Sequence, residues 1–280
     1  MTGYMKGLNR RISAANGLKL LGERNSGTNF LETLLRDHYD LHLYPNTPIV
    51  GGKLIPTAPK GHIPEGIAGK AAREAVGDHL HYVQLPESGG WKHAAPDERF
   101  YREFILPRDP AVLILIRHPA SWLASMHRNP FHRLVHIPDD FSRFIRQPWL
   151  TLPRDGLGPR QYDTIIDMLA AKALAYDRLT IRHENSAVLR YEDLAQDPQS
   201  TLATLGLTPR APFSSDRPAP DARPFIQPRR RWWQLRRSAQ PARDYRARAA
   251  QAGWNQLADK DRDFVLERLA DSPLIQLFPR

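Results

Sequence analysis

The sequence contains no cysteine, and this absence excludes several kinds of chemistry at once. Disulfide bonds, metal sites built on thiolates and cysteine nucleophiles all need thiol groups. A chain without thiols also suits a reducing compartment, in which disulfide bonds do not persist. Any active site must therefore be built from other side chains.

Long apolar runs are also missing. The longest useful one, residues 111–116, has the length of a strand, whereas a membrane-spanning helix needs about 18 apolar residues or more. The N-terminal residues are basic but lack a continuous apolar segment, so the sequence predicts no secretory signal. We expect a cytoplasmic protein, and a location at the inner membrane surface stays open as an alternative.

Length and composition are those of a folded protein. Of the 280 residues, 41% are hydrophobic and 25% are charged, which is close to the average for globular proteins and excludes a largely disordered chain. This length suits one large domain or two small ones. We expect a single α/β domain over residues 1–280.

The positive charge is concentrated in one segment. The formal net charge is +10 at pH 7. Between Thr208 and Ala250, eleven Arg stand against three Asp, with no Lys and no Glu, so +8 of the total falls there. The same stretch holds seven of the 25 prolines. The basic character therefore belongs mainly to an Arg/Pro-rich segment at about 208–245, and the rest of the chain is nearly neutral.

Apolar patterns predict strands that alternate with helices. Strands are expected at 18–22, 111–116 and 187–191, and helices after residue 29, from 119, from 162, from 198 and near 264–275. Such an alternation implies a three-layer fold with a central, mainly parallel sheet flanked by helices. Residues 45–90, rich in Pro, Gly and His, predict a loop-rich insertion with little regular structure.

The turn after the first strand has the spacing of a phosphate loop. Gly22 and Gly27 form a G-x-x-x-x-G pattern, and the backbone N–H groups of such a turn, with a helix N-terminus behind them, bind anions. In NTP-hydrolysing loops Lys and Ser/Thr follow, but here Thr28 and Asn29 do. The loop therefore disfavours a Mg²⁺-dependent NTPase. Taken alone, it also fits an ordinary strand–helix turn capped by Ser26 or Thr28.

Four segments together resemble the P-loop sulfotransferases, which use PAPS (3′-phosphoadenosine 5′-phosphosulfate). Residues 22–32 (GERNSGTNFLE) resemble the family's 5′-phosphosulfate loop, and residues 91–93 (WKH) its strand-end Lys and His. Residues 116–126 (IRHPASWLASM) resemble the 3′-phosphate motif, and residues 189–198 contain a similar RYEDL…DP pattern. The segments follow the family's order, so the resemblance implies a P-loop-type α/β fold.

The resemblance also implies a reaction and its catalytic residues. The family transfers a sulfuryl group from PAPS, without a metal, to a hydroxyl of a small molecule or a carbohydrate. His93 is the general base that we expect, because a neutral imidazole suits proton abstraction. Lys92 or Arg24 would neutralise the departing oxygen. Asn25 stands where the family has Lys or Arg, so either those two residues take over that role or catalysis is lost.

The nucleotide site that the resemblance implies draws on several segments. Arginine suits a phosphate because its fork binds two oxygens. The expected binding residues are Asn25, Ser26, Gly27, Thr28 and Asn29 of the loop, Arg117 and Ser125 for the 3′-phosphate, Tyr191 near the adenine, and Arg229 and Arg230 from the basic segment. Structural alternatives stay open for several of these segments. Arg117 could be a strand-end cation without a ligand, Ser125 a serine on a helix surface, and the acids at 192–193 could cap or pair with nearby groups.

Residues 229–237 (RRRWWQLRR) have the most distinctive local composition. They fit a solvated loop, a segment that closes over the nucleotide, or a contact with an anionic or membrane surface, where Trp and Arg favour the interface. Basic and aromatic residues also suit single-stranded nucleic acid, but nothing else in the sequence indicates a nucleic-acid module, so we do not expect that partner.

The sequence does not indicate a metal site, and it leaves functions other than catalysis open. The histidine pairs 79/81 and 132/136 each lack a clear third ligand, so no metal site is expected. The alternative to an enzyme is a catalytically inactive nucleotide- or polyanion-binding protein of the same fold, or a membrane-surface or RNA-associated protein that uses residues 229–237.

Overall fold

The centre of the molecule is a parallel sheet with the strand order β1–β4–β7. The computed structural model describes residues 2–46, 49–50, 53–54, 67–130, 136–210, 249 and 252–279. The strands are β1 (Leu18–Gly22), β4 (Ala111–Ile116) and β7 (Ser186–Arg190). Every residue of β1 and β4 is buried, as expected for parallel strands covered on both faces.

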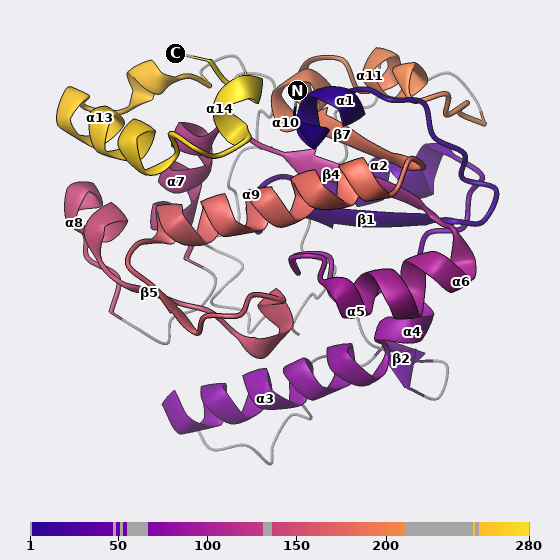
Figure 1. The fold of residues 1–280 in the computed structure, drawn as a ribbon, viewed down its shortest axis with the longest axis horizontal. Coiled ribbons are helices and arrows are strands. Elements are labelled where there is room, and N and C mark those ends of the chain that lie inside the picture. Colours follow the sequence, from indigo (N-terminus) through magenta and orange to yellow (C-terminus); the bar gives the residue numbers. More distant parts are fainter. Residues whose placement is uncertain are drawn as a thin grey trace, which may run out of the picture.

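Two hydrophobic cores lie on the two faces of this sheet, because successive side chains of a strand point to opposite sides. Val112, Ile114 and Ile116 belong to one core, and the intervening Leu113 and Leu115 belong to the other. Helix α9 (Ile165–Arg182) covers the first face and crosses in front of the strands in Figure 1, whereas α2 (Thr28–His38) covers the second face. The expected α/β arrangement of a parallel sheet flanked by helices is confirmed.

Shorter elements complete the fold. The other helices and turns are α1 (Gly3–Gly7), α3 (Ile67–Val83), α4 (Leu85–Ser88), α5 (Glu98–Phe100), η1 (Tyr101–Ile105), α6 (Leu106–Arg108), α7 (Pro119–Arg128), α8 (Phe141–Arg146), η2 (Pro153–Asp155), α10 (Tyr191–Gln196), α11 (Pro198–Thr204), η4 (Trp254–Gln256), α13 (Asp259–Arg268) and α14 (Leu274–Leu277). Two antiparallel pairs lie outside the central sheet: β2 (Ile49–Val50) with β3 (Lys53–Leu54), and β5 (Trp149–Leu150) with β6 (Gln161–Tyr162).

The predicted elements agree with the structure except at some boundaries. β1 and β4 have the predicted bounds, whereas Tyr191, expected to end the third strand, begins α10. The long helix starts at Ile165 instead of 162, because Thr164 caps it by accepting from two backbone N–H groups. Helix α11 begins at Pro198 as expected, and Asp197 caps it, with its carboxylate accepting from Ser200 N at 3.0 Å.

The expectation of little regular structure over residues 45–90 is wrong for its second half. Residues 67–83 form α3, since their Ala, Leu, Arg, Glu and Lys residues favour a helix strongly enough to outweigh two glycines. Arg154 anchors this helix through ion pairs with Glu74 and Asp78. His79 is exposed and His81 is buried, so the pair does not share a face as it would in a strand.

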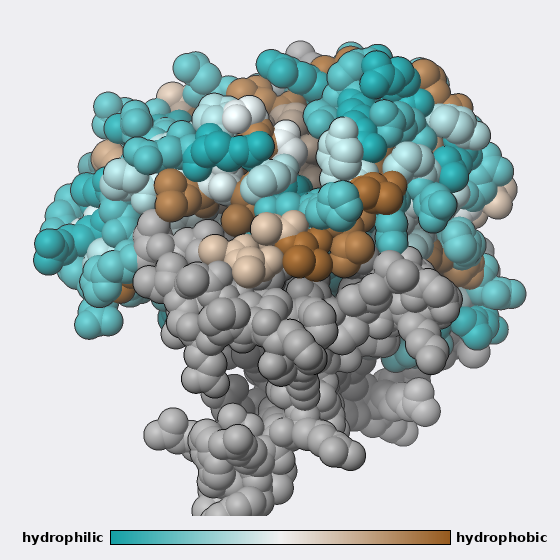
Figure 2. Space-filling view, turned by 90° about the horizontal axis from the view of Figure 1, so that it is seen from below, coloured by the Kyte–Doolittle hydropathy of each residue, from teal (hydrophilic) through white to brown (hydrophobic). Residues whose placement is uncertain are grey.

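Helix α3 lies along the lower edge of the molecule in Figure 1. The view from below shows a few apolar groups among mostly hydrophilic ones on the described surface (Figure 2). Val76, Tyr82 and Val83 are exposed large apolar residues of this helix. Within the described ranges, none of the helices combines the length and the apolar character needed to cross a membrane.

Candidate active site

The phosphate-type loop joins β1 to α2 at the carboxyl end of the central sheet. Asn25 (φ 59°) and Gly27 (φ 96°) both have the left-handed backbone conformation. A Cβ atom at Gly27 would lie 2.4 Å from Cδ2 of the Tyr191 ring, so this close approach requires glycine. The two bends direct the chain into α2, which begins at Thr28.

The start of α2 presents free backbone donors. Among the described residues, the N–H groups of Gly27, Thr28 and Asn29 have no acceptor. The first N–H groups of an α-helix have no partner within the helix, and the helix dipole adds partial positive charge there. The first turn contains no acidic side chain. This end of α2 is therefore able to bind an anionic oxygen.

Lys92 reaches this helix end from a distant part of the sequence. Its Nζ atom lies 2.5 Å from Asn29 Oδ1 and 3.0 Å from Glu32 Oε2, on the first two turns of α2. The main chain makes a further link, since Gly22 N donates to Lys92 O at 2.9 Å. The turn that contains Lys92 and His93 is thus attached directly to the phosphate-type loop.

His93 is buried beside the same loop, with a defined tautomer. Its Nδ1 atom lies 2.6 Å from Gly22 O. Because a carbonyl only accepts, Nδ1 donates this hydrogen bond, and Nε2 of the neutral ring is left as an acceptor. Burial, followed by the charges of Lys92 and Arg24, holds the pKa of His93 well below its usual value. The ring is therefore neutral at physiological pH.

Arg24 points into the interior, although it follows directly on the loop's first residues. Its guanidinium pairs with Asp155 at 3.3 Å and lies 4.3 Å from the centre of the Trp91 ring. Its main-chain oxygen accepts from Trp122 Nε1 at 2.6 Å. To neutralise a departing oxygen, as the resemblance implies, Arg24 would have to leave an ion pair in which both side chains are only 3% exposed. The ion pair of Lys92 with Glu32 lies nearer the surface, with 10% and 18% exposed, so the geometry favours Lys92 for that role.

The 3′-phosphate motif meets the loop from β4. Arg117 Nη1 donates to Asn25 O at 2.9 Å, and its guanidinium lies 4.9 Å from the centre of the Tyr191 ring. The Asn25 side chain donates to Asn129 O at 3.1 Å, at the end of α7. Ser125, also on α7, has a hydroxyl without a hydrogen bond to any described residue.

Two of the loop's predicted binding residues, Ser26 and Thr28, are buried. Ser26 Oγ also donates to Glu23 O at 2.5 Å. The acids next to Tyr191 have structural partners: Glu192 Oε1 accepts from His118 N at 3.0 Å, and Asp193 pairs with Arg190. These acids therefore follow the capping and pairing alternative. Arg229 and Arg230, like residue 132, lie outside the described residues.

A cluster of buried charges beneath the loop was not expected from the sequence. Lys172 of α9 is 0% exposed. Its Nζ atom lies 2.6 Å from Glu23 Oε2 and 2.9 Å from Asp155 Oδ1. Although burial raises the pKa of Asp155, the charges of Lys172 and Arg24 outweigh it and lower that pKa below the usual value. The available signal was a lysine on the apolar face of the long helix, between Leu169 and Tyr176.

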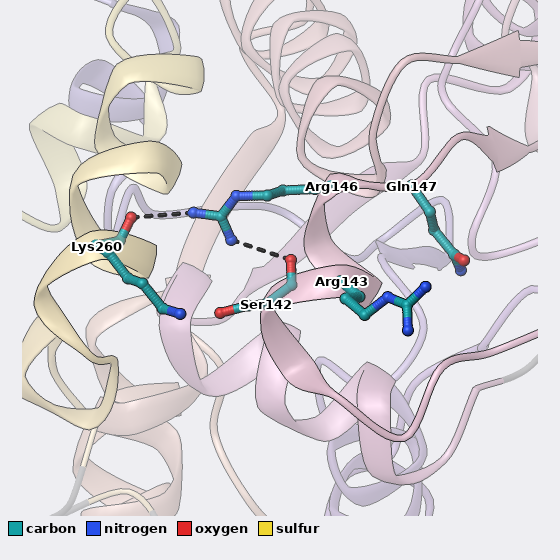
Figure 3. Close-up of a pocket in the computed structure, with 5 residues that line it drawn as sticks. All are labelled: Ser142, Arg143, Arg146, Gln147 and Lys260. Carbon is teal, nitrogen blue, oxygen red and sulfur yellow. Dashed lines mark hydrogen bonds between the residues drawn. The ribbon is translucent and has the colours of Figure 1, made fainter.

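The described residues border two cavities of different character. A hollow of about 480 Å³ lies between α8 and α13 and is lined by basic and polar side chains: Ser142, Arg143, Arg146, Gln147 and Lys260 (Figure 3). In Figure 3 the ends of the Arg143 and Lys260 side chains lie apart, so these two cations do not converge. A smaller cavity of about 20 Å³ lies behind the loop, next to Glu23, Ser26 and Lys172. In the described part of the chain no cluster of His, Asp and Glu could hold a metal ion.

No protein-family model matches the chain, and no curated protein matches it.

Proposed function

We propose that the chain is a PAPS-dependent sulfotransferase that transfers a sulfuryl group to a hydroxyl of a small molecule or a carbohydrate. The observation that carries this proposal is the approach of the Lys92 ammonium to Asn29, at 2.5 Å. It puts a cation from another segment at the helix end where NTP-hydrolysing loops use their own lysine. In this loop Thr28 occupies the position of that lysine, and Asn25 occupies the position where the sulfotransferases have a basic residue. Lys92 compensates for both.

The 5′ end of the donor would bind at the start of α2. The free N–H groups of Gly27, Thr28 and Asn29 are aligned to bind phosphate oxygens. Lys92 would shift toward the bridging oxygen as negative charge develops there. Sulfuryl transfer resembles phosphoryl transfer in this respect, since positioning and electrostatic stabilisation supply most of the catalysis.

The 3′-phosphate would bind between β4 and α7. Arg117 already lies next to the loop, and its guanidinium can form two parallel hydrogen bonds to a phosphate. The Ser125 hydroxyl is available from α7. A nucleotide with this second phosphate should therefore bind more tightly than one that has a hydroxyl in its place.

His93 would accept the proton of the acceptor. In the transfer, a bond forms between the acceptor oxygen and sulfur, the bond between sulfur and the bridging phosphate oxygen breaks, and the proton passes to His93 Nε2. Nε2 is the unprotonated nitrogen, because Nδ1 donates to Gly22 O. Burial and, after it, nearby cations hold the pKa of His93 down. The negative charges of the bound nucleotide would oppose the cations and raise the basicity of the ring.

Calorimetry with PAP (adenosine 3′,5′-bisphosphate) and ADP in the presence of EDTA tests the proposal. We expect PAP to bind without metal and more tightly than ADP. Ser125→Ala should weaken PAP binding by about tenfold, as for a hydrogen bond to a charged group, and leave ADP binding unchanged. Equal affinities of the wild-type protein for PAP and ADP would refute the proposed nucleotide site.

A nucleotide-binding protein without catalysis is the second candidate. It is favoured by one observation: both cations that could neutralise the departing oxygen are already paired with acids, Arg24 with Asp155 and Lys92 with Glu32. Labelled sulfuryl transfer from PAPS to a panel of sugars and phenols separates the two functions. An enzyme should lose turnover in Lys92→Met and His93→Gln while both variants still bind PAP. Tight PAP binding with no transfer to any acceptor would favour the inactive protein.

A further inference from the structure

We propose that Lys172 is a positioning residue, which holds the turn of Lys92 and His93 against the phosphate-type loop. The catalytic consequence rests on the proposed function, but the contacts do not. Lys172 and these two segments are far apart in the sequence: the lysine lies on α9, on the opposite side of the sheet from α2. Lys172 is 0% exposed, so it would act through the segments that it holds and not by contact with a nucleotide or an acceptor.

The Lys172 ammonium has three close partners. Nζ donates hydrogen bonds to His93 O at 2.8 Å and to Asp155 Oδ1 at 2.9 Å, and it forms an ion pair with Glu23 Oε2 at 2.6 Å. Glu23 belongs to the phosphate-type loop. His93 belongs to the turn of Lys92 and His93, which we call the catalytic turn because the proposed function uses both residues. One buried atom thus joins both halves of the candidate active site to α9.

Asp155, on η2, holds the same turn through further contacts. Its main-chain oxygen accepts from Ala95 N at 2.7 Å, just beyond the catalytic turn. A Cβ atom on the next residue, Gly156, would lie 2.2 Å from Ala95 O, so the two segments are in close contact. The Asp155 carboxylate also accepts from Leu152 N at 2.7 Å. The turn is therefore held at His93 O and at Ala95 N.

Close packing alone would not require charged side chains at the buried position of Lys172. Lys172 takes a position on the helix between Leu169 and Tyr176, where an apolar side chain of similar length would fit. Buried ion pairs are often no more stabilising than the apolar side chains that could replace them. Their specific contribution is direction, because two hydrogen bonds and a short ion pair from one ammonium fix three partner atoms relative to one another. In this cluster the partner atoms belong to the loop, the catalytic turn and η2.

Three variants of the full chain test the proposal. Lys172→Met removes the donors but leaves Glu23 unpaired, so it could lower stability for a trivial reason. The double variant Glu23→Gln with Lys172→Met removes both charges, keeps an acceptor for Arg24 N, and leaves the ion pair between Arg24 and Asp155 intact. Lys260→Met, on an exposed lysine of α13, is the matched control.

The first readout needs no ligand. Nuclear magnetic resonance detects the His93 Nδ1–H proton, which Gly22 O protects from exchange with water in the wild-type protein. We expect at least tenfold faster exchange in the double variant, together with nearly wild-type thermal stability, and no change in the control. Wild-type exchange of this proton in the folded double variant would overturn the proposal.

The second readout links the contacts of Lys172 to the reaction. The double variant should lose at least tenfold in kcat for sulfuryl transfer, while its affinity for PAP changes by less than threefold. Full turnover in that variant would also overturn the proposal. If the wild-type protein binds no PAP, the proposed function fails, but the exchange of the His93 proton still decides whether Lys172 positions the turn.

Discussion

Positive charge is used in two different ways in this molecule. Beneath the candidate active site, Lys172 and Lys19 are each 0% exposed, and each ammonium donates two hydrogen bonds of 2.8 to 2.9 Å to acceptors within the protein. In the hollow between α8 and α13, by contrast, Arg143 and Lys260 are exposed, and the ends of their side chains lie apart (Figure 3). The hollow is larger, but its charges do not converge on a common point. A site is indicated by the positioning of its charges more than by their number or by the volume they surround.

Lys19 shows how far this positioning extends from the loop. Its Nζ atom donates to Ser88 O and Gly90 O at 2.8 Å each, and also to Pro45 O and the Asn46 side chain at 3.2 and 3.3 Å. Burial, followed by repulsion from Lys92, lowers its pKa to about 7. Strand β1 is thereby tied to two loops, one of which leads directly into the turn of Lys92 and His93.

The largest effect should follow from removing the acid that two buried cations share. Asp155→Ala leaves both Arg24 and Lys172 without their common partner, and breaking a buried ion pair costs about 3–5 kcal/mol. Urea unfolding measures the change. The matched control is Asp259→Ala, whose side chain is 86% exposed and which should change stability by less than about 0.5 kcal/mol. Equal effects of the two substitutions would erase the distinction between the buried and exposed charges.

A buried histidine should make the region around the loop sensitive to acid. Burial, followed by repulsion from Arg117, lowers the pKa of His118 from 6.5 to about 4. Between these pH values the unfolded chain binds a proton that the native protein does not, so the free energy of unfolding falls as the pH falls. The full shift corresponds to a loss of roughly 3 kcal/mol.

Chemical unfolding at a series of pH values measures this loss. His118→Asn is the matched variant, because an amide oxygen can replace the ring nitrogen that accepts from Ala120 N and caps α7. The difference between the wild-type protein and this variant should change from pH 6.5 down to pH 4 and should level off below pH 4. A difference that stays constant over this range would show that His118 keeps an ordinary pKa.

An intermediate effect is expected for the one arginine of the hollow that has a well-defined partner. Arg146 lies 2.6 Å from Asp261, with 35% of its own side chain exposed and 6% of the partner's. Arg146→Met leaves Asp261 with two short contacts from the Ser142 hydroxyl. Stability should therefore fall by about 1 kcal/mol, as for a partly exposed ion pair. A loss as large as that of Asp155→Ala in the same urea titration would place this pair in the buried class.

Local patterns were enough to predict the frame of the fold. β1 and β4 are continuous apolar runs, and a parallel strand buried on both faces needs that pattern. Gly27 could be predicted to bend the loop because two spaced glycines mark such turns. Thr164 was missed as the start of α9, because the apolar period extends back to Tyr162 and only the capping bonds show where the helix begins.

The direction of long side chains could not be predicted in the same way. Arg24 and Lys92 both looked able to reach the phosphate site, but Asp155 draws Arg24 inward from 131 residues away. The direction of the Lys172 side chain depends on partners from the loop, from the turn of Lys92 and His93, and from η2. No period or motif encodes such pairings, since they arise only when the sheet brings distant segments together. A lysine in an apolar helical face is the sign that was available.

The smallest effects should come from the exposed cations of the hollow. Arg143→Ala and Lys260→Ala should each change stability by less than about 0.5 kcal/mol. PAP affinity should also stay within about twofold at 0.15 M salt, because ions screen exposed charges over about 8 Å. At low salt we expect both variants to bind PAP and ADP more weakly, and by a similar factor, since a distant charge acts on any anion. A tenfold loss confined to PAP would mean direct contact with the 3′-phosphate, and would move the nucleotide from the loop of β1 to the hollow between α8 and α13.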